Sequence, residues 1–166
     1  MMKAFRISPL ALKRFWRSED GVALVEFGLL LPVMLLVFAV IMEGSRAFWS
    51  YHMAVTGVRD ATRFLSRTAP ANACVTGAPS SITSQLDDIV KRAASNSVFP
   101  GYVTVGTVSA SFVCGTGTYR VSPVSVGTVT ANVTIEYPFS GIFQFFGKSL
   151  TTTQASIQDS ARIYGI

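Results

Sequence analysis

The stretch from Gly21 to Met42, GVALVEFGLLLPVMLLVFAVIM, constrains this chain more than any other part of the sequence. An α-helix rises about 1.5 Å per residue and needs about 20 apolar residues to cross a hydrocarbon core of about 30 Å. The run from Val22 to Met42 is long enough, and only Glu26 and Pro32 interrupt its apolar character. It therefore predicts a membrane-spanning helix.

The two interruptions are unusual in a lipid-facing helix. A carboxylate in hydrocarbon costs a few kcal/mol even on the mildest scale, so Glu26 is a functional residue by default. The alternative is that Glu26 lies at the headgroup level and snorkels into water. Pro32 removes one backbone donor and crowds the carbonyl of Gly28, so Gly28 and Pro32 mark the expected helix kink.

The charge distribution predicts the orientation of the span. The 166-residue chain has a formal charge of +5. Residues 1–21 contribute +3 of this charge, because five Lys or Arg residues face only Glu19 and Asp20 there. Basic residues before a span stay in the cytoplasm. A basic chain can also be a nucleic-acid binder, but the concentration of its charge before the span argues against that class.

The sequence therefore divides into a basic cytoplasmic leader (1–21), a transmembrane helix (22–42), a helical continuation (43–66) and an outer domain (67–166). In the continuation, an apolar stripe recurs close to the helical period and is expected to face the outer domain, which predicts one helix from Val22 to Ser66; the stripe consists of Phe48, Tyr51, Val55, Val58 and Leu65. Three aromatic residues just beyond the span are typical of an interfacial belt; they are Phe48, Trp49 and Tyr51. Three arginines recur every four residues and share one face, which is either solvated or faces an anionic partner; they are Arg59, Arg63 and Arg67.

The outer domain is predicted to have an α+β fold. Residues 67–80 are small, polar and broken by Pro and Gly, which indicates a loop. A second helix starts at an N-cap at Ser80 or Ser81, and Pro100-Gly101 closes it. Asp87–Lys91 and Asp88–Arg92 are expected ion pairs four residues apart along it. Alternating residues after it predict an antiparallel sheet of about four strands packed on the helices. The expected strands are 103–112, with a bulge near Gly106, a weaker strand at 119–126, the clearest at 129–137, and the last at 150–159.

Two further features of this domain leave alternatives open. Cys74 and Cys114 both lie in the part expected outside the cell membrane, where an even number of cysteines indicates a disulfide; the alternative is two unpaired thiols. Residues 138–147, PFSGIFQFFG, are rich in aromatic side chains. They indicate either a helical turn that caps the sheet or an exposed patch for another subunit or the membrane surface.

The sequence carries no motif for catalysis, for a cofactor or for a metal. It has no G-x-S-x-G, H-E-x-x-H, Walker loop or CxxC pattern, and one histidine limits the options for a general base. We therefore expect a protein that is not an enzyme, with no catalytic residues, no cofactor and no metal site.

The basic flank, Gly21, the following Val-Ala-Leu-Val-Glu26-Phe27 and the Glu43-Gly44-Ser45-Arg46 continuation together resemble the TadE-like minor pilins, or pseudopilins, of tight-adherence pili. The resemblance covers about Arg14 to Ser66. It implies cleavage between Gly21 and Val22 by a prepilin peptidase, with Glu26 and Phe27 in the processing and assembly motif. It also implies a location in the inner membrane, with the domain in the periplasm or in an extracellular pilus.

The implied partners are the prepilin peptidase, other pilin subunits with their assembly machinery, and inner-membrane lipid. Major pilins of this system usually carry Tyr after the Glu and are much shorter, so Phe27 and the full domain favour the minor class. The alternative function is an uncleaved single-pass protein whose outer domain is a binding or sensory module. Cleavage after Gly21 discriminates between the two.

Overall fold

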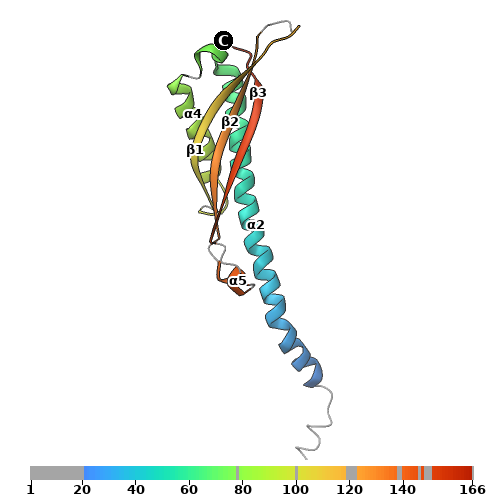
Figure 1. Cartoon of the computed structure of the whole chain (residues 1–166). Coiled ribbons are helices and arrows are strands. Elements are labelled where there is room, and N and C mark those ends of the chain that lie inside the picture. Colours follow the sequence, from blue (N-terminus) through green and yellow to red (C-terminus); the bar gives the residue numbers. More distant parts are fainter. Residues whose placement is uncertain are drawn as a thin grey trace, which may run out of the picture. The chain divides into compact units, whose positions relative to one another are not determined.

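The computed structural model describes residues 21–77, 79–99, 101–118, 123–137, 140–145, 147 and 151–165. The chain forms two compact units, residues 1–40 and 41–166, and each is considered by itself. The predicted leader, apart from Gly21, lies outside the described residues. The elements, labelled in Figure 1, are the helices α2 (Val22–Thr68), α3 (Ala73–Thr76), α4 (Ser80–Ser95) and α5 (Ser140–Phe145) and the strands β1 (Val103–Gly115), β2 (Val124–Glu136) and β3 (Thr152–Arg162).

Helix α2 is one continuous helix of 47 residues that includes Pro32. The prediction of a helix over Val22–Ser66 is confirmed, and the helix extends to Thr68. Its burial changes along its length. Every residue from 22 to 35 is exposed, whereas the part after Met42 buries one side. The buried residues of α2 are Glu43, Ala47, Ser50, Ala54, Gly57, Val58, Ala61, Thr62, Leu65 and Ser66.

The three strands form one antiparallel sheet in the order β1-β2-β3. The register between β1 and β2 shifts between Val105 and Val108, so Gly106 and Thr107 both face Asn132. This is the bulge that the alternation of apolar residues predicted near Gly106. The side-chain amide of Asn132 donates a hydrogen bond to Thr107 Oγ1 at 3.0 Å and closes the irregularity.

The described sheet has three strands, and the prediction of about four was wrong. The expected weak strand at 119–126 and the clear strand at 129–137 do not separate, because β2 runs without a break from Val124 through Gly127; residues 119–122 lie outside the described part. Gly127 is not a turn residue. A Cβ there would lie 2.9 Å from both Leu65 Cδ2 and Ile163 Cδ1, so glycine lets the strand approach the core closely.

The segment between α2 and β1 differs from the prediction in two details. The expected loop 67–80 contains the short helix α3, and α4 begins at Ser80 with Pro79 as its N-cap residue, without a side-chain hydrogen bond to the cap. Proline suits a helix start because its missing N–H would have no partner in the first turn. The two expected ion pairs along α4 are present, Lys91–Asp87 at 2.6 Å and Arg92–Asp88 at 3.9 Å.

The predicted aromatic segment 138–147 contains α5, a helix of 6 residues. Pro138, Phe139 and Phe146 and the side chains of Ile142, Phe143 and Phe145 lie outside the described part. A helical turn is therefore formed; its capping of the sheet and the alternative of an exposed patch both stay predictions.

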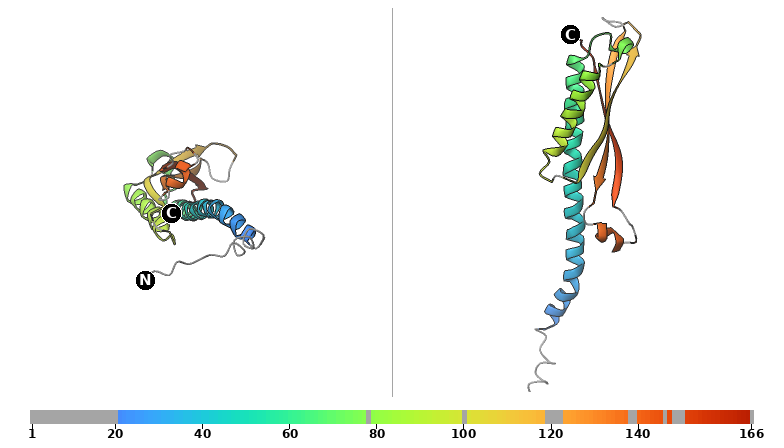
Figure 2. Two further views of the ribbon diagram at one scale, coloured as in Figure 1. Left: turned by 90° about the horizontal axis from the view of Figure 1, so that it is seen from below. Right: turned by 90° about the vertical axis from the view of Figure 1, so that its left-hand side faces the viewer.

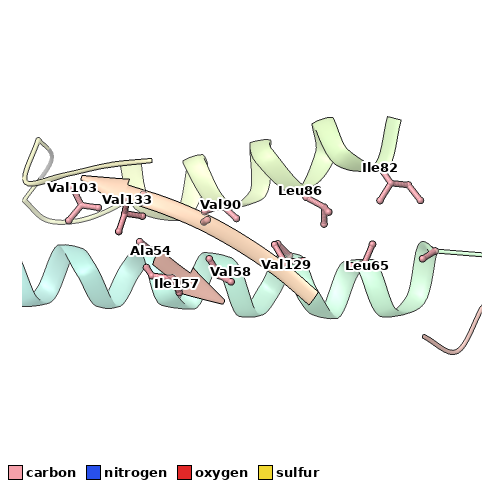
Figure 3. Close-up of a cluster of buried hydrophobic side chains, with 14 of the residues drawn as sticks. Ala54, Val58, Leu65, Ile82, Leu86, Val90, Val103, Val129, Val133 and Ile157 are labelled. Carbon is pink, nitrogen blue, oxygen red and sulfur yellow. The ribbon is translucent and has the colours of Figure 1, made fainter. Parts of the chain in front are cut away.

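The core of residues 41–166 lies between the two long helices and one face of the sheet. The second half of α2 and α4 lie on the same side of the sheet (Figure 2). Val58, Leu65, Leu86 and Val129 are fully buried and point toward one another from three elements (Figure 3). The opposite face of the sheet presents exposed polar side chains; they include Ser109, Ser111, Asn132, Ser156 and Ser160.

Close contact between α2 and α4 depends on small residues. A Cβ added at Gly57 would lie 2.7 Å from Ala93 Cβ and 3.1 Å from Val90 Cα, distances that real Cβ atoms avoid. The helices can therefore approach this closely only because position 57 has no side chain. The predicted apolar stripe was partly wrong. Phe48 is 64% exposed, and small residues such as Ala54 and Ala61 are fully buried on the side of α2 that faces the core.

We expect Gly57→Ala to lower the free energy of unfolding of the domain by about 1–2 kcal/mol. Overpacking costs about 1–3 kcal/mol, which exceeds the gain of about 0.5–1 kcal/mol from better helix propensity. Gly44→Ala is the matched control, because no atom lies within 4 Å of its added Cβ. Denaturant unfolding in detergent, followed by near-UV circular dichroism, measures both. Equal stability of the two variants would contradict close packing of α2 against α4 at Gly57.

Candidate functional site

The predicted processing segment lies at the start of α2. Gly21 is the first described residue and is exposed, and the helix begins immediately after it at Val22. A Cβ at Gly21 would meet nothing within 4 Å, so the fold around it does not require a glycine. Packing among the described residues therefore gives no reason for a glycine at position 21. Glu26 and Phe27 are exposed on the first turns of the helix.

The span itself offers an exposed apolar surface that Glu26 interrupts near its start. Helix α2 is long and apolar enough to cross a membrane, and none of its most apolar 18-residue window is buried. A core helix of a soluble domain would bury this surface. Gly28 and Pro32 both lie within the helix and are exposed; the predicted kink between them stays a prediction.

Directly after the span, α2 and the segment between α4 and β1 form a cluster that we call the base cluster. Its members are Glu43, Ser50, Ser97 and Tyr102, which are buried, and Arg46 and Phe99, which are partly buried. Glu43 is 1% exposed, and its Oε2 accepts a hydrogen bond from the Tyr102 hydroxyl at 3.4 Å. A buried carboxylate is stable only where hydrogen bonds or charges compensate it. The cluster therefore ties the start of β1 to the helix one residue beyond Met42.

Arg46 belongs to the same cluster. Its guanidinium carbon lies 5.5 Å from the centroid of the Phe99 ring, within the range of a cation–π contact. Its Nε is buried and has no hydrogen-bond partner among the described residues. One donor of this arginine is thus removed from water without an acceptor from the described part of the chain.

The serines complete the cluster one turn further along. Ser50 Oγ donates to the Phe99 carbonyl at 3.0 Å, and Ser50 and Ser97 Oγ lie 3.0 Å apart. The Phe99 N–H donates to Ser97 Oγ at 3.3 Å. All three contacts are satisfied together if Ser97 donates to Ser50. The segment that carries Phe99 is held against α2 by this ring of bonds.

Sequence reasoning did not identify the burial of Glu43. The available signal was its spacing, because Glu43 shares the repeat of Ala47, Ser50, Ala54 and Ala61 along the buried side of α2. The apolar residues that we used for the stripe are larger and lie at its margin; Tyr51 and Val55 are only partly buried. A stripe of small residues would have located the buried side more accurately than a stripe of large ones.

The other charged and aromatic candidates are exposed. Phe48 is 64% exposed and Trp49 is 52% exposed. The Phe48 and His52 rings meet edge-to-face, with their centroids 4.3 Å apart. Tyr51 instead packs against the core. Among the three arginines that share a face, Arg63 reaches Asp60 at 3.4 Å, an exposed pair that contributes little to stability.

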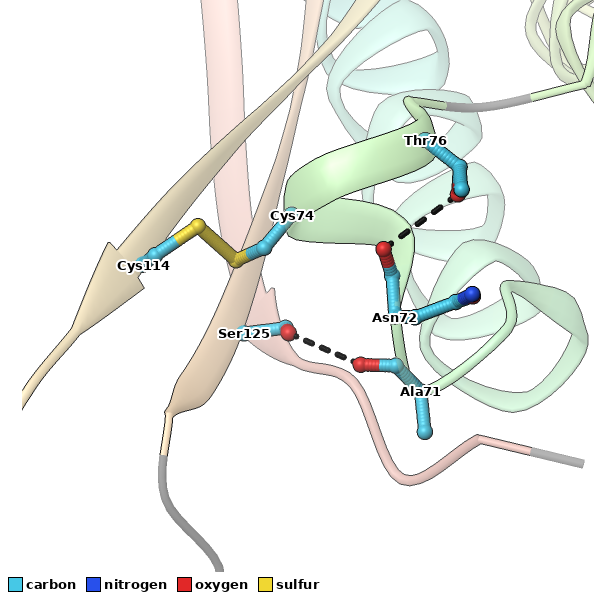
Figure 4. The surroundings of a disulfide bond; sticks show 6 residues. All are labelled: Ala71, Asn72, Cys74, Thr76, Cys114 and Ser125. Atoms are coloured by element: carbon cyan, nitrogen blue, oxygen red, sulfur yellow. Dashed lines mark hydrogen bonds between the residues drawn. A yellow bond between two sulfur atoms is a disulfide. The ribbon is translucent and has the colours of Figure 1, made fainter.

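The structure brings the two cysteines together. A disulfide joins Cys74 of α3 to Cys114 of β1, with the Cα atoms 5.7 Å apart (Figure 4). Ser125 Oγ of β2 donates to the Ala71 carbonyl at 3.1 Å, which fixes the segment before α3 from a second strand. These two contacts attach the segment that follows α2 to the end of the sheet where β1 ends and β2 begins.

In the described part of the chain, no group of three or more His, Cys, Asp or Glu side chains is placed to hold a metal ion. A groove lies beside the β1 bulge, between it and α4, and is lined by Ser80, Thr83, Ser84, Asp87, Lys91 and residues 106–108.

Comparison with known proteins relates the first part of α2 to a family. The family model described as TadE-like protein matches residues 21–63. The match begins at Gly21, includes Glu26 and Arg46, and ends within α2 before the outer domain. No curated protein and no solved structure matches the chain. The resemblance inferred from the sequence is thus confirmed over this segment.

We expect the Cys74–Cys114 bond to stabilise the domain by about 4 kcal/mol, less any strain, because it closes a loop with a sequence separation of 40 residues. The double variant Cys74→Ser, Cys114→Ser should lose most of this stability in denaturant unfolding. Ser125→Ala, which removes only a neighbouring hydrogen bond, should lose about 1 kcal/mol. Maleimide labelling of unreduced, denatured protein should find no free thiol; two labelled cysteines would disprove the bond.

Proposed function

We propose that the chain, whose residues 21–63 form a TadE-like segment, is a minor pilin or pseudopilin of a tight-adherence pilus. It acts as a structural or assembly component and carries out no catalysis. The observation that carries the proposal is the position of the match, which starts at the glycine of the expected cleavage site and covers the span. The match thus includes both the expected cleavage site and the span. An ordinary membrane anchor does not need a cleavage site.

In this function the chain is inserted with its basic leader in the cytoplasm and its domain outside. The apolar surface of α2 holds it in the inner membrane before assembly. A prepilin peptidase then removes residues 1–21, and the mature chain starts at Val22. Support comes from the local structure, since α2 begins at Val22 and Gly21 carries no side chain that would obstruct a peptidase at the membrane face.

Cleavage also creates a partner for Glu26, which has no hydrogen bond or ion pair among the described residues of the precursor. The new α-amino group of Val22 is mostly protonated at neutral pH. Glu26 is the fifth residue of the mature chain and lies one helical turn from that amine. An amine of its own subunit or of the next can neutralise the carboxylate. In the proposed function, Glu26 of one subunit pairs with the Val22 amine of the next subunit, and this pair fixes the register of neighbouring helices.

The first test is processing. Coexpression with the matching peptidase should lower the mass of the wild type by that of residues 1–21, and the mature N-terminus should read Val-Ala-Leu-Val-Glu. Gly21→Trp should abolish the shift, because the side chain blocks the cleavage site. Gly28→Trp, at a glycine equally free of neighbours, should leave the shift intact. An unshifted wild type would refute the pilin function and favour the uncleaved single-pass module.

The second test concerns Glu26. We expect Glu26→Gln to be inserted and cleaved normally, but to reduce incorporation into pili, or their yield, at least about tenfold. Loss of a charge-assisted hydrogen bond of about 1.5–3 kcal/mol accounts for this factor. Leu29→Gln, nearby on the same exposed helix, controls for added polarity. Immunoblots of sheared pili provide the measurement. Wild-type assembly of Glu26→Gln would show that charge pairing is not required.

A further inference from the structure

We propose that Arg46, supported by Phe99 and flanked by Trp49, forms a binding site for the phosphate of a phospholipid headgroup. The site lies on the outer side of the membrane, at the base of the domain. This inference rests on the part of the proposed function in which α2 spans the membrane. It does not depend on cleavage or on assembly into a pilus.

The position along α2 is the first observation. Arg46 comes one helical turn after Met42, the last residue of the apolar run, so it lies at the depth of the headgroups if the run fills the hydrocarbon core. Trp49 is three residues further, on the same side of the helix, and is 52% exposed. Tryptophan is enriched at this level because one end of its ring system is apolar and the other donates a hydrogen bond.

The geometry of Arg46 is the second observation. Its guanidinium is held over the Phe99 ring at 5.5 Å, and the buried Nε donor has no acceptor among the described residues. The side chain as a whole is only partly buried. A guanidinium with one face fixed keeps its planar set of donors ready for an anion, and this planar set matches a phosphate group.

The nearby carboxylate does not occupy this arginine. Glu43 is buried at 1% exposure and accepts from the Tyr102 hydroxyl. The ion pairs within 4.0 Å among the described residues join other side chains; they are Arg63–Asp60, Lys91–Asp87 and Arg92–Asp88. The guanidinium charge is therefore available to an outside anion. A phospholipid fits better than free phosphate, because the exposed indole of Trp49 gains from acyl contact only with a lipid.

The experiment uses the full, uncleaved chain in detergent, with Trp16→Phe so that Trp49 is the one tryptophan left of the two. Phosphatidylglycerol with brominated acyl chains is titrated in as the probe, and quenching of Trp49 fluorescence reports its binding. We expect Arg46→Gln to weaken the apparent affinity about tenfold. Arg59→Gln, on the same helix well beyond the base cluster, should bind like the parent. Phe99→Leu should give a smaller loss, because the charge remains and only its support is removed.

Three results would overturn the inference. Equal titration curves for Arg46→Gln and its parent would show that the guanidinium does not bind the headgroup. Displacement of the lipid by inorganic phosphate at equal concentration would indicate a free-anion site. Absence of quenching in the parent would show that Trp49 lies away from lipid. Because the precursor itself is measured, a failure of peptidase processing leaves all three readouts unaffected, so the two proposals can fail separately.

Discussion

Hydrocarbon offers no hydrogen-bond partner to a polypeptide backbone, and the long apolar helix α2, on which the rest of the structure is built, meets that constraint. A segment that spans alone must be helical, because only a helix satisfies its N–H and C=O groups internally. The apolar run of α2 meets this requirement, and none of its most apolar window is buried by the rest of the chain. The same helix continues as far as Thr68, so the domain is built on the second half of a helix whose first half is long and apolar enough to cross a membrane. The outer half of α2 then needs a second hydrophobic environment, and α4 and the sheet supply it.

The two halves of α2 differ in the size of their side chains and in their exposure. In the span, large aliphatic side chains such as Leu29 and Val33 are exposed on all sides. In the outer half, Gly57, Ala54 and Ala61 allow close approach, and the larger side chains that fill the core come mainly from the partners, as with Leu86 and Val129. A helix covered with leucines throughout would keep α4 and the sheet at a greater distance. The change from large to small residues beyond Met42 thus separates the exposed apolar part of α2 from the part that packs against α4 and the sheet.

The base cluster lies where these two demands meet. Glu43 is buried beneath Tyr102, and the Ser50–Ser97–Phe99 hydrogen bonds hold the segment after α4 against the helix. Such bonds contribute only about 0.5–1.5 kcal/mol each, but breaking one leaves a buried group unsatisfied, which costs more. At the other end of the domain, the disulfide and the Ser125–Ala71 bond attach the end of α2 to the sheet. The domain is therefore fastened to its helix at both ends by specific contacts, with apolar packing between them.

The sequence by itself determined the long helix, the second helix, the bulge near Gly106 and the TadE-like segment, because each depends on local periodicity, local composition or a contiguous motif. Charge placement likewise gave the Asp87–Lys91 and Asp88–Arg92 pairs. Only the tertiary structure decided that Gly127 continues a strand, that Glu43 is buried and that Phe48 is exposed. Each of these depends on which residues far apart in the chain come together, such as Leu65 and Ile163 around Gly127 or Tyr102 over Glu43. A one-dimensional pattern reports the period of a face, but it does not report how closely another element approaches that face.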